Sequence, residues 1–359
     1  MSTSNPVIAR AEAFCAAYGL RVPILLAPMA GACPASLSIA VANAGGLGSC
    51  GALLMQPAAI KVWAAEMRAG SNGGFNLNLW IPDPPATRDA EAEDAVRAFL
   101  HGWGPEVARE AGDVSPPDFA AQCEALLEVG PTIISSIMGL YPPPFVERMK
   151  AKRIKWFANA TTVAEAKAAE AAGADVIVAQ GMEAGGHRGA FDAAKAQTEL
   201  VGLFALLPAI VDAVKVPVVA TGGIADARGI AAALTLGASA AQIGTGFLRC
   251  PEAKLAPAWA DAIGRTLPEQ TLVTRAFSGR PGRAIATAYA RAATAPDAPD
   301  PAPYPVQRGL TQAMRDAATK NNDIDRIQAW SGQSARLAMA EPAGNVVREL
   351  WSGAQTLLR

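Results

Sequence analysis

A repeated alternation of short apolar strands and helices constrains the fold of this 359-residue chain more strongly than any other feature. Each expected strand leads into a helix, and these helices commonly end at a glycine, which is a frequent helix stop. We expect eight strands, at residues 24–31, 47–52, 74–80, 132–139, 155–162, 175–181, 216–223 and 238–248. This count predicts an α/β fold of the (β/α)8 TIM barrel type, because a doubly wound open sheet would need no eighth strand.

Two segments of different composition interrupt the repeat. Residues 81–117 are rich in proline and charge, and we expect them to form a partly helical insertion in one βα loop. The barrel is then expected to use residues 1–80 before the insertion and residues 118–250 after it. Residues 251–359 lie beyond the repeat and form a C-terminal extension. We expect the insertion and the extension to pack together as a smaller, partly helical cap over the barrel mouth.

The composition argues against several classes of function. The net charge is −1, so neither nucleic acid nor an acidic membrane surface is an expected partner. We find no apolar run of about 18 residues and no signal-peptide pattern, which together favour a cytoplasmic protein without a membrane span. The five cysteines show no CxxC spacing, and no HExxH motif occurs. No metal site and no disulfide framework are therefore expected.

A glycine-rich loop follows the sixth expected strand, within residues 175–191. The loop holds His187, one of two histidines in the chain, together with Gln180, Glu183 and Arg188. In parallel α/β proteins, loops at the carboxyl ends of buried strands carry binding and catalytic residues. We therefore interpret this loop as functional, whereas a single histidine in isolation would favour an ordinary surface loop.

Two further glycine turns follow the seventh and eighth expected strands, at residues 221–226 and 242–247. In these barrels the corresponding loops make a phosphate site, because glycine lets backbone N–H groups converge on phosphate oxygens. Thr221 and Thr245 add hydroxyl donors. Either turn alone is common, but both in these two loops predict a ligand that carries phosphate.

The other strand ends offer amides and hydroxyls and few carboxylates. This argues against a magnesium-dependent barrel and against a glycosidase with two carboxylates. No GxGxxG or GxxxxGK[ST] fingerprint follows a strand. Amides and hydroxyls beside one phosphate site suit flavin mononucleotide (FMN), whose flat ring needs donors and acceptors along its edge. The polar side chains in question are Asn76, Asn78, Ser135, Ser136, Asn159, Thr161 and Gln180.

Several of these segments carry a resemblance to one family. LAPMAGA, AGGLGS, FNLNL, AQGMEAGGHRG, ATGGIAD, QIGTGFL and TRAFSGRPGRAI resemble the nitronate monooxygenases, once called 2-nitropropane dioxygenases. The match runs from about residue 20 to residue 290. The later segments YPVQRGLT and WSGQSARLA resemble the first class of that family. This chain departs from the family pattern at Arg308, after YPVQ, where we expect histidine in many members.

The resemblance implies a noncovalent FMN and His187 as the catalytic residue. It implies that O2 oxidises nitronates, and nitroalkanes as further candidates, to a carbonyl compound and nitrite or nitrate through a flavin semiquinone. The expected FMN contacts are Pro28, Met29, Asn78, Ser135, Thr161, Gln180, Gly185, Gly186, Gly222, Gly223, Gln242, Ile243, Gly244 and Thr245. Arg275 and Ser278 are expected on the substrate side. The small-molecule partners would then be a nitronate and O2, for a monomer or a homodimer.

Two roles for His187 stay open at this point. A neutral imidazole can take the proton next to a nitro group, and an imidazolium can stabilise an anionic nitronate; we favour the second. Two rival functions also stay open. The EAGGH segment is shared with flavin-dependent reductases, so an NAD(P)H-dependent reductase of an enoyl thioester or a quinone is one alternative. A flavin-free barrel that binds a phosphorylated ligand, as an isomerase or lyase, is the other.

Overall fold

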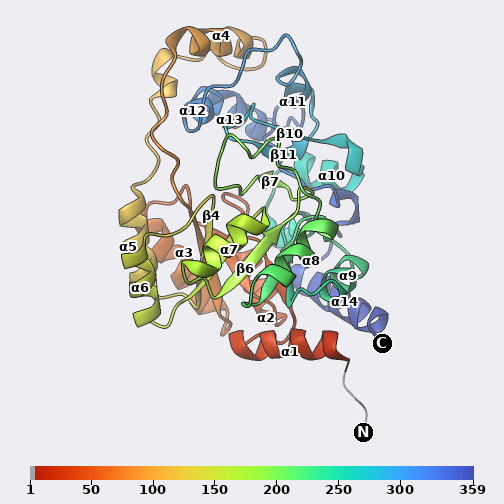
Figure 1. Cartoon of the computed structure of the whole chain (residues 1–359). Helices are drawn as coiled ribbons and strands as arrows, with labels where there is room; N and C mark the ends of the chain where they lie inside the picture. Colours follow the sequence, from red (N-terminus) through yellow and green to blue (C-terminus); the bar gives the residue numbers. More distant parts are fainter. Residues whose placement is uncertain (1–4) are drawn as a thin grey trace.

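The computed structural model describes residues 5–359 and contains eight parallel strands around one core (Figure 1). The strands follow one another around the sheet in the order β1-β9-β8-β6-β5-β4-β3-β2. They are β1 (Ile24–Leu26), β2 (Gly48–Gly51), β3 (Phe75–Trp80), β4 (Ile133–Ile137), β5 (Lys155–Ala160), β6 (Val176–Gln180), β8 (Val218–Thr221) and β9 (Ala240–Ile243). Each observed strand lies inside one of the eight expected ranges.

The two edge strands of this sheet meet and close it into a barrel. Leu25 and Leu47 form an isolated parallel bridge between β1 and the residue before β2. The backbone N–H of Leu26 donates to the carbonyl of Leu47 at 2.9 Å, and the N–H of Leu47 donates to Ile24 at 3.1 Å. The prediction of a TIM barrel is therefore confirmed.

Seven helices alternate with the strands around the barrel. They are α2 (Ala35–Asn43), α3 (Pro57–Gly70), α5 (Phe119–Val129), α6 (Pro143–Ala151), α7 (Val163–Ala171), α8 (Leu203–Ala213) and α9 (Ala227–Thr235). The side chains of Asp118, Thr162 and Asp226 accept backbone N–H bonds at the starts of α5, α7 and α9. Such caps pair N–H groups that have no partner inside the helix. None of the helices within residues 5–359 is long and apolar enough to cross a lipid bilayer.

The eighth helix position belongs to the end of the chain. α14 (Ala343–Leu357) packs against α9 and α2. Figure 1 shows α14 beside α9. Its face toward the barrel buries Val346, Val347, Leu350 and Ala354. The end of the C-terminal extension is thus part of the barrel wall, a position that the sequence analysis did not foresee.

The first helix, α1 (Pro6–Tyr18), covers the end of the barrel opposite the cap (Figure 1). Phe14 and Tyr18 on α1 stack toward Phe157 in β5, with ring centroids 6.2 and 5.0 Å from it. These rings join the aliphatic side chains at the amino ends of the strands in one buried cluster. This cluster fills the bottom of the barrel, so the open end lies at the carboxyl ends of the strands.

The insertion and the extension share an apolar cluster of their own at the top of Figure 1. Val96 and Leu100 on α4 (Ala90–Leu100) pack with Phe277, Tyr289 and Leu310. The other α-helices are α10 (Pro257–Arg265), α11 (Ala288–Ala292), α12 (Val306–Leu310) and α13 (Gln312–Lys320). The short 3-10 helices are η1 (Arg109–Gly112), η2 (Thr245–Phe247), η3 (Pro251–Ala253), η4 (Pro268–Gln270) and η5 (Ala335–Leu337). The division of the chain at residues 80, 117 and 250 stays a prediction.

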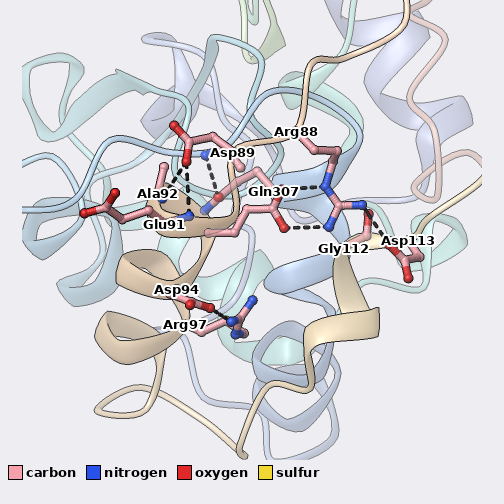
Figure 2. A network of polar contacts seen from close by, with 11 residues as sticks. Arg88, Asp89, Glu91, Ala92, Asp94, Arg97, Gly112, Asp113 and Gln307 are labelled. Carbon is pink, nitrogen blue, oxygen red and sulfur yellow. Dashed lines mark hydrogen bonds and ion pairs between the residues drawn. The ribbon is translucent and has the colours of Figure 1, made fainter.

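A polar network joins the early and the late residues of the insertion (Figure 2). Arg88, before α4, pairs with Glu93 in the first turns of α4 and with Asp113 at the far end of the insertion, 2.7 Å away. Its guanidinium also donates to the carbonyl of Gly112 at 3.2 Å. Hydrogen bonds from Arg88 lower the pKa of Glu93, whose side chain is almost fully buried. One arginine therefore holds the two ends of the insertion together.

A second, three-stranded antiparallel sheet lies over the barrel mouth. Its strands are β10 (Thr271–Thr274), β11 (Gly282–Ile285) and β7 (Gly186–His187). In the register, His187 lies opposite Gly282 and Gly186 lies opposite Arg283. The glycine-rich loop after β6 is thus a strand of a sheet that the extension completes, which no local pattern in the sequence indicated.

Candidate active site

A cavity of about 180 Å³ opens at the carboxyl ends of the barrel strands, beneath the three-stranded sheet. Most of the residues predicted for the site line it, although they come from six different strands of the barrel and the loops that follow them. Those that line the cavity are Pro28, Met29, Asn78, Ser135, Gln180, Gly185, Gly186, His187, Gly222, Gly223, Gln242, Gly244 and Thr245.

Two predicted cofactor residues are not brought to the cavity wall. The hydroxyl of Thr161 donates to a carboxylate oxygen of Glu165 at 2.8 Å, and the other oxygen of Glu165 accepts from the N–H of Phe191 at 2.7 Å. Thr161 therefore helps to fix the end of the His187 loop. Ile243 is almost fully buried within β9, and its carbonyl accepts from the N–H of Ala27 at 2.9 Å.

Arg275 lies away from this cavity, beside a second hollow. Its guanidinium donates to the carbonyls of Gly279 and Pro301 at 3.1 and 2.9 Å. These bonds join two segments of the extension, so the geometry favours a structural role over substrate contact. Ser278 is different, because its hydroxyl oxygen lies 2.8 Å from Nε2 of His187.

The glycine-lined end of the cavity has the backbone shape that a phosphate requires. Gly222 and Gly223 have φ values of +107° and +69°, a region that favours glycine. A Cβ on Gly222 would lie 3.1 Å from the backbone nitrogen of Ala184, so the turn has no room for a side chain. The hydroxyl of Thr221 donates to the carbonyl of Gln242 at 3.0 Å and joins the two glycine turns. This end therefore fits the phosphate of FMN, with backbone rather than side chains facing it.

Two buried N–H donors on the cavity wall have no protein acceptor within residues 5–359. They are Nδ2 of Asn159, at the end of β5, and Nε1 of Trp259, on α10. A buried donor without an acceptor is costly, so both fit a ligand with acceptor atoms, as a flavin ring has. Within the same residues, no three His, Cys, Asp or Glu side chains converge on a possible metal. Trp259 lies in the extension, where the sequence carried no signal for it.

Gln180 has a task in addition to the one expected. Its side-chain amide donates to the carbonyl of His187 at 3.2 Å, and its oxygen accepts from the N–H of Gly189 at 2.8 Å. Both bonds hold the backbone on either side of Arg188. Gln180 lines the cavity and at the same time fixes the loop that carries His187.

His187 is held at the other end of the cavity by three segments that lie far apart in sequence. Its ring lies between Trp80, at the end of β3, and Trp330 of the extension, with centroids 4.6 and 4.8 Å away. Both contacts are close to edge-on. Ser278, in the loop between β10 and β11, fixes the ring edge at Nε2. No sequence pattern placed Trp80 here, whereas Trp330 lies in the WSGQSARLA segment that carried the family resemblance.

The surroundings of His187 favour its neutral form. Burial, followed by the positive charges of Arg280 and Arg308, lowers the pKa of the imidazole from 6.5 to about 3. Arg280 forms an ion pair with Asp83 and donates to the carbonyl of Ala190 at 2.6 Å. The surroundings of the ring therefore favour the uncharged imidazole over the imidazolium.

The loop before His187 is tied down by buried charged groups. The guanidinium of Arg188 donates to the carbonyl of Gly181 at 2.7 Å, and burial lowers its pKa to about 10. Arg283 donates to the carbonyl of Met182 at 2.9 Å, and Glu183 accepts from the N–H of Leu203 at the start of α8. Arg188, Glu183 and Arg283 thus act on the shape of the loop, because each bonds backbone.

Comparison with known proteins places these features in one family. The family model for nitronate monooxygenase matches residues 13–353. A nitronate monooxygenase from Paraburkholderia phytofirmans is 37% identical over 338 residues, with 92% of both chains covered. A probable nitronate monooxygenase from Staphylococcus aureus is 34% identical, over 92% of this chain and 94% of that protein.

Two solved structures share the fold of this chain. The nitroalkane oxidase from Streptomyces ansochromogenes superimposes with a TM-score of 0.85 at 33% identity, over 95% of this chain and 98% of that chain. FabK from Thermotoga maritima superimposes with a TM-score of 0.74 at 25% identity, over 99% of this chain and 98% of that chain. With the barrel, the glycine-lined cavity and the family model in agreement over nearly the whole chain, this protein belongs to the nitronate monooxygenase family and is an oxidoreductase.

Proposed function

We propose that this protein uses FMN and O2 to oxidise nitronates to a carbonyl compound and nitrite or nitrate, with neutral nitroalkanes as further substrates. The observation that carries the proposal is that His187 and the glycine turn of Gly222 and Gly223 line one cavity. The names of its relatives support it, since they include nitronate monooxygenases and a nitroalkane oxidase.

The residues present suit a noncovalent FMN. Backbone N–H groups at Gly222, Gly223, Gly244 and Thr245 would hold the phosphate, since these residues line the glycine-rich end. The unpaired donor of Asn159 would meet acceptor atoms of the ring. When bound, FMN supplies the electron acceptor that a protein side chain cannot provide.

His187 then acts as an uncharged group. A nitroalkane is a carbon acid, and a neutral imidazole can take its proton, whereas an imidazolium cannot. Trp80 and Trp330 pack against the ring and restrict its orientation. The same geometry lets a nitronate, which has already lost this proton, occupy the site without any proton transfer.

Arg308 is the positive group that we propose for recognition of the anionic nitronate. It is half-buried and close enough to His187 to lower the pKa of that imidazole. Within the described residues no ion pair neutralises its guanidinium, whereas Arg280 is neutralised by Asp83. The departure from histidine at position 308 therefore gives this chain a permanent charge near the reaction site.

One experiment tests the proposal against both rivals. The chromophore of the purified protein is released by heat and identified by mass, and the protein is mixed without oxygen with propyl-2-nitronate or with NADH. We expect FMN, and bleaching of its visible absorbance by the nitronate alone. Bleaching by NADH alone would support the NAD(P)H-dependent reductase, and a colourless protein would support the flavin-free isomerase or lyase.

A further inference from the structure

The hydroxyl of Ser278 is the second unusual group beside the imidazole. Ser278 is 1% exposed, and its oxygen lies 2.8 Å from Nε2 of His187. It also lies 3.2 Å from the carbonyl oxygen and 3.4 Å from the backbone nitrogen of Arg280. The hydroxyl of Ser278 therefore has three hydrogen-bonding partners but only one proton to donate.

A count of donors and acceptors decides how these three bonds are shared. A serine hydroxyl donates once and accepts twice. If it donates to the carbonyl of Arg280, it can accept from the N–H of Arg280 and from a protonated Nε2 of His187, and all three groups are paired. If it instead donates to an unprotonated Nε2, the carbonyl of Arg280 loses the hydroxyl, which is its one donor among residues 5–359. Buried carbonyls are rarely left without a donor, so the first arrangement is favoured.

We propose that Ser278 is a positioning residue that holds His187 in the tautomer with its proton on Nε2, so that Nδ1 keeps a lone pair for a molecule in the cavity. Within the described residues no protein group bonds Nδ1, and His187 lines the cavity. The imidazole can then act as a base through Nδ1 only. The catalytic consequence rests on the proposed function, whereas the tautomer itself does not.

The proposed proton transfer needs only the substrate, His187 and water. The carbon next to the nitro group gives its proton to Nδ1, and the electron pair of the broken C–H bond passes into the nitro group. The products are a nitronate and an imidazolium that carries protons on both nitrogens. Nδ1 later returns its proton to water, and Nε2 keeps the bond to Ser278 throughout.

Nitrogen NMR reads the tautomer directly, without substrate and without turnover. The chain has two histidines, His187 and the exposed His101, so protein labelled with ¹⁵N-histidine gives two imidazole patterns that are easily told apart. In the holoenzyme between pH 6 and pH 8, we expect His187 to show a protonated Nε2 and an unprotonated Nδ1. A proton on Nδ1, or an imidazolium, would overturn the proposal.

Substitution of the hydroxyl gives the second arm. In Ser278→Ala we expect a mixture of tautomers or protonated Nδ1, and a fall in kcat for a nitroalkane of about tenfold or more with a smaller effect on a preformed nitronate. Ser278→Thr keeps a hydroxyl and should restore the pattern. Ser38→Ala is the matched control, because Ser38, on α2, is fully buried, donates to the carbonyl of Ser49 in β2 at 2.7 Å, and does not line the cavity.

The outcomes distinguish the role of Ser278 from the proposed oxidation of nitronates. An unchanged tautomer in Ser278→Ala would overturn the role of Ser278 even if nitronate oxidation is measured. The expected tautomer in a protein that oxidises no nitronate would leave the role of Ser278 intact and contradict the proposed function. A disordered Ser278→Thr variant would not affect the test, because the holoenzyme spectrum and Ser278→Ala already decide it.

Discussion

The two ends of the cavity are built in different ways. The glycine-lined end consists of two βα turns of the barrel, and what it presents is backbone. The imidazole end consists of side chains from β3, the loop after β6 and the extension, with Trp80, His187 and Trp330 in contact. The first end depends on local turn geometry, and the second depends on the docking of the extension on the barrel.

This difference predicts separable failures. A change in the glycine turns should weaken FMN binding, whereas a change at the imidazole end should slow chemistry and leave FMN bound. One segment touches both ends, since the N–H of Gly332 donates to the hydroxyl of Thr245 at 2.9 Å, two residues after Trp330.

His187→Asn should have the largest effect. General-base loss commonly costs a factor of about 10²–10⁴ in rate, so we expect a fall of that size in kcat for a neutral nitroalkane. Turnover of a preformed nitronate should fall much less, because it needs no proton transfer. FMN content, measured by absorbance against protein, should stay at the wild-type level. Loss of FMN in this variant would show that the two ends are not independent.

Gly222→Val is the reciprocal change at the other end. A side chain there must adopt φ near +107° and would crowd the backbone of Ala184, a strain of about 1–3 kcal/mol. We expect FMN affinity to fall by about ten- to hundredfold in a dialysis and reconstitution measurement. Gly102→Ala is the control, because a Cβ at that exposed position meets nothing closer than 3.7 Å. Full FMN occupancy in Gly222→Val would place the phosphate elsewhere.

Arg308→Gln should have a moderate effect on recognition alone. A partly solvated charge pair contributes about 1 kcal/mol, which corresponds to roughly a fivefold rise in KM for an anionic nitronate. The rise should shrink at high salt, and KM for a neutral nitroalkane should change little. An equal effect on both substrates would show that Arg308 shapes the cavity and does not attract the anion.

Arg275→Gln should have a smaller effect on the KM for nitronate than Arg308→Gln. Arg275 bonds two backbone carbonyls of the extension, so its removal should lower the melting temperature by a few degrees. We expect the KM for nitronate to be nearly unchanged and independent of salt. A KM that rises at low salt only would return Arg275 to the substrate side, where the sequence first placed it.

The pH dependence of kcat/KM for a nitroalkane should show the smallest effect of these measurements. A base is active when it is unprotonated, so kcat/KM for a nitroalkane rises through the pKa of His187 and is level above it. Because that pKa is lowered to about 3, no inflection is expected near pH 6.5. In Arg308→Gln the same pKa should move up, since one of its causes is removed. An inflection near pH 6.5 in the wild type would indicate that the imidazole is better solvated.

The barrel and its glycine-lined end could be predicted because they follow local rules. A strand, a glycine turn and a helix are each encoded within about ten residues, and the side chains of Thr162 and Asp226 cap α7 and α9 within the same short range. The imidazole end could be predicted only in part. His187 stands out as a rare residue in a glycine loop, but its pairing with β11 joins residues about 95 positions apart, and no local signal encodes such a pairing.

The same reason explains why Thr161 does not reach the cavity wall. Thr161 has the right chemistry for a ligand, yet its hydroxyl bonds Glu165. Sequence shows which side chains can bond and does not show which acceptor each one meets. Trp259 shows the converse, because it reaches the cavity from a helix of the extension that carries no recognisable motif.

The position of α14 has a consequence for synthesis on the ribosome. The chain leaves the barrel after β9, builds the sheet over His187, and returns to the barrel wall with its last helix, Ala343–Leu357. The wall therefore stays open until the final residues have left the exit tunnel, and a nascent chain carries a gap between α2 and α9. We expect a premature stop between residue 250 and the start of α14 at Ala343 to yield a chain that binds chaperones, because this gap exposes apolar barrel surface.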